Sequence, residues 1–323
     1  MALPESDHAK LGGTQLKKTS IRAACVLLGL ACLGVTAAQA QEIDFSGDWR
    51  PIYHEDGQER IPGPDIGDYT GLPLNDAARL RADSYQSARI SVVMEDICRQ
   101  HGGDYSMRGL APMRISRELD PGTGTGEPIA FRTRIGFFTM DRTIYLDGRP
   151  HPPADAPHTW QGFSTGEWVG NQLAIKTTHL KESYHRRNGV ASGADRTFTE
   201  RWVRHGDILT VVVMIEDPAF LTERLHHSQS WLLDPGQRIT VDTCDYAPEI
   251  PAAAGTIPHY LPGQNPFLTE FADLTGISRK AARGGAETMY PEYRLQMEAA
   301  TVKPERCTLY CTCMNQGAVC PVK

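Results

Sequence analysis

The segment "TIYLDGRPHPP", residues 143–153, brings ionisable side chains together at a point where regular structure should end. Its prolines restrict the backbone, so Arg149 and His151 would be held in place with little conformational entropy left to lose. A rigid, polar and irregular segment beside an open cavity is a common location for binding residues. We therefore predict that Arg149 and His151 bind a ligand, whereas Asp147 can equally serve the turn by accepting its hydrogen bonds.

Two other side chains have types that suit proton transfer. Residues alternate between the faces of a strand, so "LAIKTTH" places His179 on the face of its apolar residues, and "FTERW" places Glu200 between Phe198 and Trp202. A carboxylate among aromatic rings loses solvation and needs a compensating cation, which a protonated imidazole supplies. We predict that His179 and Glu200 meet inside the protein as an acid–base pair. The alternative is a buried polar pair that only closes the structure.

Basic and aromatic residues near these positions complete the predicted site. Lys181 is assigned to catalysis because it could stabilise developing negative charge, and it could hold an anionic end of a ligand together with Arg149. The segment that follows, "SYHRRNG", can equally be a solvated surface. The remaining predicted ligand-binding residues are Tyr145, His158, Trp160, Tyr184, Arg186 and Trp202.

A metal site and a cofactor site have little support in the sequence. His179 and His185 could bind a metal with Glu182 or Glu200, but no H-x-H or H-E-x-x-H spacing accompanies them. The chain also contains no Walker loop and no dinucleotide-binding fingerprint. We predict neither a metal nor a cofactor.

The elements that must position these residues are short strands. Eight segments are rich in Val, Ile, Thr, Phe and Trp, and each is bounded by turn residues. Their even spacing and hairpin-length links predict an all-β core, an antiparallel eight-stranded barrel around one ligand-sized interior; a two-sheet sandwich is the alternative. The predicted strands are 129–139, 142–147, 162–169, 172–179, 196–204, 207–216, 226–233 and 237–242.

Helices are predicted on both sides of this core. Asn75 is a good N-cap for a helix that continues to about Gln86. Residues 41–70 read as short strands and turns, and residues 102–126 read as a loop. Proline-punctuated sequence follows Cys244, and two short helices are then expected near 266–274 and 278–288.

The first forty residues have the pattern of a secretory signal. Basic residues precede an apolar run that is too short to span a bilayer, and the run ends in Ala38-Gln39-Ala40. We predict cleavage after Ala40 and a periplasmic or secreted protein. The predicted organisation is a signal peptide at 1–40, a lipocalin-like β domain at 41–247, and a linker, short helices and a disulfide-rich tail at 248–323.

Cysteine usage agrees with export. Two of the eight cysteines lie in the predicted signal, and an even number in an exported protein favours disulfides. The simplest partition pairs Cys98 with Cys244. The other four are Cys307, Cys311, Cys313 and Cys320, for which a soft-metal site is the alternative.

Several quoted motifs also resemble a known group of proteins. The succession "RTIYLDGRPHPPADAPHTWQGFSTGEW", "TTHLKESYHRRNG", "FTERW" and "EDPAFLTE", from about Arg142 to Pro235, resembles a large family of secreted bacterial proteins of unassigned function. Members of that family carry "WEGD" where this chain has "WVGN", and a serine-aspartate step where it has Ala194-Asp195. The segment "FSGDWRP" is similar to the G-x-W entry of lipocalin-like barrels.

These observations predict an exported barrel that binds a small apolar, aromatic molecule. Cofactor-independent acid–base chemistry of the lyase or isomerase type is expected on that molecule. The alternatives are a carrier without turnover and a structural or partner-binding envelope protein that uses its tail. The net charge is −6, and it becomes −8 once the four Lys/Arg and two Asp/Glu of residues 1–40 are removed, so nucleic acid is not an expected partner. The mature chain is not expected to span a membrane.

Overall fold

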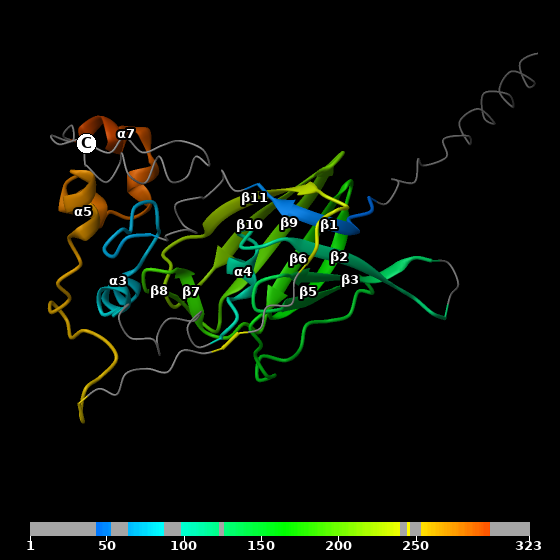
Figure 1. The fold of residues 1–323 in the computed structure, drawn as a ribbon, viewed down its shortest axis with the longest axis horizontal. Helices are drawn as coiled ribbons and strands as arrows, with labels where there is room; N and C mark the ends of the chain where they lie inside the picture. Colours follow the sequence, from blue (N-terminus) through cyan, green and yellow to red (C-terminus); the bar gives the residue numbers. More distant parts are fainter. Residues whose placement is uncertain are drawn as a thin grey trace, which may run out of the picture. The chain divides into compact units, whose positions relative to one another are not determined.

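The core of the protein is a closed barrel of nine strands, seen in a computed structural model that describes residues 43–52, 64–86, 98–122, 126–239, 244–245 and 253–297 (Figure 1). The predicted signal peptide and the four tail cysteines lie outside the described residues. Around the barrel the strands follow the order β1-β11-β10-β9-β6-β5-β4-β3-β2. Their bounds are β1 Gly47–Pro51, β2 Met113–Leu119, β3 Pro128–Ile135, β4 Met140–Tyr145, β5 Phe163–Val169, β6 Gln172–Thr178, β9 Thr197–His205, β10 Ile208–Glu216 and β11 Leu225–Leu233.

This architecture confirms an all-β barrel and corrects the predicted strand set. The sandwich alternative is wrong because the strands close into a ring, and the ring has nine strands rather than eight. Seven of the eight predicted segments are strands. The eighth, 237–242, is irregular from 237 to 239, and its remaining residues lie outside the described part of the chain.

The ring is completed by β1 and by β2, of which β2 was predicted as loop. In β2, Met113 and Ile115 are buried while Arg114 and Ser116 are exposed, so the strand has a two-residue period that is only a few residues long. β1 contributes Trp49, which is fully buried and lies beneath the guanidinium of Arg204, whose Cζ is 5.3 Å from the ring centre.

The barrel wall has one weak seam, between β4 and β5. These neighbours run parallel, whereas the other neighbours in the ring are antiparallel, and β4 and β5 are paired only at Ile144–Ser164 and Tyr145–Thr165. Parallel neighbours require a crossover that returns the chain to the same end. Residues 146–162 form this crossover, which explains why regular structure stops after "TIY" in the motif that opens the sequence analysis.

Besides the barrel, the described chain forms short helices and a separate hairpin. Helix α3 (Asp76–Asp83) begins as predicted, because the Asn75 side chain accepts a hydrogen bond from the amide of Ala78. Beside it lies the β7–β8 hairpin, Ser183–Arg186 and Val190–Ser192 (Figure 1). The other helices are α4 Gly103–Ser106, α5 Glu270–Thr275, α6 Arg279–Ala282, η3 Ala286–Met289 and α7 Pro291–Gln296. Within the described ranges, no helix has the length and apolarity needed to cross a membrane.

The barrel interior is filled largely by aromatic and aliphatic side chains. The ring of Phe45 packs edge-on against Phe131 and Trp202, with centroids 5.9 and 5.6 Å apart, and it stacks on Trp168 at 5.7 Å. Edge-to-face aromatic pairs contribute about 0.5–1.5 kcal/mol beyond the burial of their area. Arg142 and Glu200 are buried charged side chains in this largely apolar interior.

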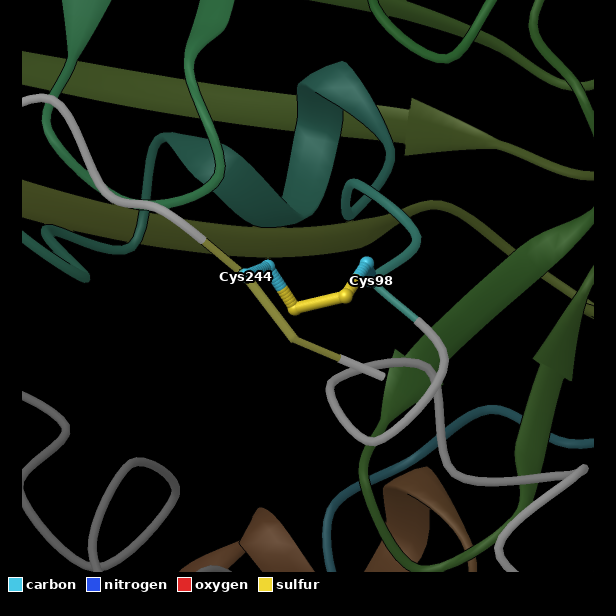
Figure 2. Close-up of a disulfide and its surroundings, with 2 residues drawn as sticks. All are labelled: Cys98 and Cys244. Carbon is cyan, nitrogen blue, oxygen red and sulfur yellow. A yellow bond between two sulfur atoms is a disulfide. The ribbon is translucent and has the colours of Figure 1, made fainter. Parts of the chain in front are cut away.

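A disulfide joins Cys98 to Cys244, as the cysteine partition predicted (Figure 2). The two residues are 146 positions apart in the sequence. A bridge over such a long stretch restricts the unfolded chain and stabilises the folded one. Disulfides are typical of oxidising compartments, so this bridge is compatible with a protein outside the cytoplasm.

Candidate functional site

The predicted pairing of His179 with Glu200 is wrong. Glu200 does point into the barrel and is fully buried, and its partner across the strands is Ile175. Strand β6 ends at Thr178, and His179 has a left-handed backbone with a φ of 58°. The simple alternation therefore fails at this residue. The His179 ring contacts Thr178 Oγ1 through Nδ1 and the carbonyl oxygen of Pro153 through Nε2.

The cation beside Glu200 is Arg142, which is not among the predicted site residues. Nη2 of Arg142 donates to Oε2 of Glu200 at 2.6 Å, and the two side chains are 2% and 0% exposed. The indole of Trp202 donates to the other carboxylate oxygen at 3.1 Å. Arg142 lies on the same face of β4 as buried Met140 and Ile144. The sequence therefore held a signal for this ion pair, because Arg142 and Glu200 are both charged residues at every-second-residue spacing from apolar ones.

A pocket of about 410 Å³ lies at the β4–β5 seam. It is lined by residues 141–143, Tyr145, residues 158–163, Gln100 and Lys181. Its volume is within the range of small-molecule sites. Tyr145 lies on the face of β4 opposite to buried Ile144, so this pocket opens on the outer side of the wall. The predicted location of the ligand, in the barrel interior, differs from this. Four predicted site residues meet there: Tyr145, His158, Trp160 and Lys181.

Backbone hydrogen bonds between two irregular segments position one wall of the pocket. The amide of Thr159 donates to the carbonyl of His179, and the amide of Lys181 donates to the carbonyl of Thr159, both at 2.9 Å. This short parallel bridge sets His158 beside His179, with ring centroids 5.3 Å apart, and Lys181 over Trp160. The Lys181 Nζ lies 5.2 Å from the centre of the indole ring.

Two further aromatic residues, Tyr145 and Phe163, line the same pocket. The ring of Tyr145 stacks on that of Phe163 with a centroid distance of 5.3 Å. On Tyr145 lies the guanidinium of Arg149, whose Cζ is 3.8 Å from the ring centre. The lining of the pocket therefore includes several aromatic side chains, and a cation lies over two of them, Tyr145 and Trp160. Aromatic lining of this kind is suited to an aromatic ligand.

Arg149 does not line the pocket directly, and its charge is already compensated. Its guanidinium donates to both oxygens of Asp147, whose own side chain also accepts from the Arg149 amide at 3.2 Å. Hydrogen bonds from Arg149 lower the pKa of Asp147 below its ordinary value. The structure therefore gives Asp147 the turn-forming role that was considered in the sequence analysis, and it ties Arg149 to that turn.

His151 is held by hydroxyl groups on the outer face of the barrel. Its Nδ1 lies 2.7 Å from Thr178 Oγ1, and its Nε2 lies 2.9 Å from Thr165 Oγ1. Burial lowers the pKa of His151, and electrostatic interactions with Lys176 and His179 lower it further. Because the Pro153 carbonyl can only accept, the His179 Nε2 must donate to it, and Thr178 then donates to His179 and accepts from His151. His151 therefore orders the crossover and does not contribute to the lining of the pocket.

His158 has a defined tautomer in the pocket wall. Its Nδ1 lies 2.8 Å from the carbonyl oxygen of Leu180, which is an acceptor, so Nδ1 carries the proton and Nε2 is left as an acceptor. Among the described residues, Nε2 has no hydrogen-bond partner. A histidine held in this way and lining a pocket can accept a proton from a bound molecule.

Three other predicted site residues lie elsewhere. Tyr184 and Arg186 are on the β7–β8 hairpin, where the Tyr184 ring packs edge-on against Tyr85 and Arg186 forms an ion pair with Asp68 at 3.7 Å. Trp202 lies inside the barrel as the partner of Glu200. The structure does not bring these three residues to the seam pocket.

Beneath the pocket lies a buried network of charges. Arg196 donates to both oxygens of Asp104 at 2.9 and 3.1 Å and to the carbonyls of Lys181 and Gly193 at 2.7 Å. Burial alone would raise the pKa of Asp104, but the attraction of Arg196 outweighs burial and lowers the pKa to about 2. His185 lies between this carboxylate and that of Asp217, to which its Nε2 is bonded at 3.0 Å. Through the Lys181 carbonyl, Arg196 supports the wall that carries Lys181.

Other familiar chemistries do not fit the described residues. Residues 162–166 match the G-x-S-x-G pattern of hydrolases, but Ser164 lies within β5, is fully buried and shares a hydrogen bond with Thr177 Oγ1 at 2.8 Å. A hydrolase nucleophile needs an exposed position on a sharp turn between a strand and a helix. Among all the residues that the structure describes, no group of three or more His, Cys, Asp and Glu residues is arranged to hold a metal.

Comparisons with known proteins leave the family open. No protein-family model matches the chain, and no curated protein sequence matches it. A mutant of the fluorescent protein UnaG is similar in structure over 58% of this chain and 95% of that chain, with 13% sequence identity and a TM-score of 0.25. Such values carry no argument about ligand or activity, so the barrel assignment rests on its own strand order.

Proposed function

We propose that this protein binds a small aromatic molecule in the seam pocket and acts as an exported binding or carrier protein. The observation that carries the proposal is the pocket of about 410 Å³, whose lining includes the aromatic residues Tyr145, Trp160 and Phe163. The Cys98–Cys244 disulfide supports the export that the first forty residues predict. The family resemblance and the signal peptide stay predictions.

Replacing Trp160 with alanine should weaken the binding of aromatic probes by about tenfold. Loss of one stacking surface costs about 1–1.5 kcal/mol, which corresponds to this factor in the dissociation constant. Isothermal titration calorimetry with naphthamide and naphthoate measures the change. The control is Tyr290→Ala, which removes an aromatic side chain that is 56% exposed and does not line the pocket. Absence of binding to the wild type, or equal affinities in the Trp160 and Tyr290 variants, would contradict the proposed function.

A second candidate function is proton abstraction, and the tautomer of His158 favours it. The predicted base pair, His179 with Glu200, is not assembled, but His158 Nε2 is an available acceptor and Lys181 is close enough to the same pocket to stabilise negative charge. In this reaction the imidazole takes a proton from a carbon next to a carbonyl group, and the electron pair of the broken C–H bond forms an enolate. Returning the proton to a different atom completes an isomerisation.

Phenylpyruvate in heavy water tests this second function, because its benzylic carbon carries acidic protons. A general base should raise the rate of deuterium incorporation by at least about a hundredfold over the buffer, measured by proton NMR. The variant His158→Phe should lose this acceleration, and His226→Phe, a change at an exposed histidine of β11, should keep it. Equal rates in both variants, or no acceleration by the wild type, would remove proton abstraction and leave a carrier.

A further inference from the structure

Arg142 is incompletely satisfied by its surroundings. Its side chain is 2% exposed, and Nη2 donates to Glu200. Within the part of the chain that the structure describes, its Nε and Nη1 atoms are buried and have no hydrogen-bond acceptor. A buried donor without a partner costs about 1–3 kcal/mol, and buried polar groups are nearly always paired. The arrangement therefore points to an acceptor that arrives with a ligand.

The position of Arg142 connects it to the seam pocket. The residue itself lines the pocket, and its guanidinium Cζ lies 5.5 Å from the centre of the Phe198 ring. A Cβ built on Gly103 would lie 3.4 Å from the Phe198 ring and 2.9 Å from the carbonyl oxygen of Gln161, which also lines the pocket. Arg142 is thus a lining residue of the pocket, and its guanidinium packs against the Phe198 ring. Since β4 and β5 are paired only at Ile144 and Tyr145, strand pairing does not close the wall at Arg142.

The charges around the pocket favour an anion. Asp141 lines it, but both of its oxygens accept from Arg134, at 2.8 and 2.7 Å. Glu200 compensates Arg142 from the interior, and Lys181 adds a positive charge at the rim. Glu200 also fixes the guanidinium in place, so little further ordering is needed when an acceptor binds.

We propose that the ligand of the seam pocket is an aromatic carboxylate, whose acid group accepts hydrogen bonds from Nε or Nη1 of Arg142. This inference rests on the proposed binding function and names the class of its ligand. Its aromatic part lies between the Tyr145 and Trp160 walls, and Lys181 attracts the anion at the entrance. Arg142, rather than Arg149, is the arginine that recognises the anion. Arg142 lines the pocket, and among the described residues its Nε and Nη1 have no acceptor, whereas Arg149 does not line the pocket and donates to both oxygens of Asp147.

Paired probes that differ only in charge test this inference. Calorimetry with naphthoate and naphthamide should show that the wild type binds the carboxylate about thirtyfold more tightly, as expected for charge-assisted hydrogen bonds. The double variant Arg142→Met/Glu200→Gln removes both buried charges, so it avoids an isolated buried ion. In this variant the preference should fall to a few-fold, while the affinity for naphthamide stays near that of the wild type. Circular dichroism confirms that the barrel is folded.

The outcomes separate this inference from the proposed function. If both probes bind the wild type equally, or if the double variant keeps the full preference for naphthoate, the carboxylate assignment is overturned and aromatic binding stands. If neither probe binds, the proposed function fails as well. The variant Lys181→Met should retain most of the preference, because Lys181 is exposed and its charge is screened. Complete loss of the preference for naphthoate in Lys181→Met would show that Lys181 recognises the carboxylate, and it would overturn the role of Arg142.

Discussion

Replacing Arg196 with methionine is expected to lower the free energy of unfolding by about 3–5 kcal/mol, because Asp104 would then be a buried charge without a partner. Both side chains are at most 1% exposed, and Arg196 also satisfies the carbonyls of Lys181 and Gly193. Urea unfolding followed by tryptophan fluorescence measures the change. Since the Lys181 carbonyl loses its donor, naphthoate binding should weaken in the same variant.

The dependence of this stability loss on pH distinguishes an unpaired Asp104 from other causes of instability. In the wild type the pKa of Asp104 is lowered to about 2 from 3.8, so its stabilisation is present above about pH 4 and is lost as the pH falls toward 2. Without Arg196, burial raises this pKa, and protonation then relieves the strain. The stability difference between wild type and variant should therefore narrow from about pH 7 to about pH 5. A constant difference over that interval would show that Asp104 is not the cause.

The strands of the barrel were readable because their signal is local. In β6 and β9 the inward residues repeat every second position, and the prediction that Glu200 points inward is confirmed. β2 was not predicted as a strand, because its inward apolar residues are few and prolines lie near both of its ends. Closure of the ring could not be read from single strands, since β1 pairs with β11 and β2 across long stretches of sequence.

The site was harder to predict because it depends on pairings between distant segments. His179 departs from alternation through the backbone angle of one residue, which lies next to the bridge between Thr159 and Leu180. The seam pocket lies where β4 and β5 pair in parallel. No local sequence pattern indicates that these two strands are parallel neighbours. What could have been inferred is the ion pair: Arg142 and Glu200 are each in phase with apolar neighbours, and each needs the other.

Replacing Glu200 with alanine is expected to lower the free energy of unfolding by about 3–5 kcal/mol. The change leaves the Arg142 guanidinium buried without a counter-ion and removes the acceptor of the Trp202 indole. The double variant Arg142→Met/Glu200→Gln should lose much less, because replacing a buried ion pair by neutral groups of similar volume is often nearly neutral. Arg142→Met, Glu200→Gln and their combination form a double-mutant cycle, with Glu200→Ala as a separate variant, and all stabilities are measured by urea unfolding.

An exposed ion pair in the same barrel is the control for this cycle. Arg132 of β3 and Glu118 of β2 are 61% and 40% exposed and lie 2.7 Å apart, so Glu118→Ala should leave the unfolding midpoint nearly unchanged. The contrast arises from solvent: water screens the outer pair, while aromatic side chains surround the inner one. If Glu200→Ala lowers the free energy of unfolding as little as Glu118→Ala does, then water or another anion already compensates Arg142. Its guanidinium would then have no need of a ligand carboxylate.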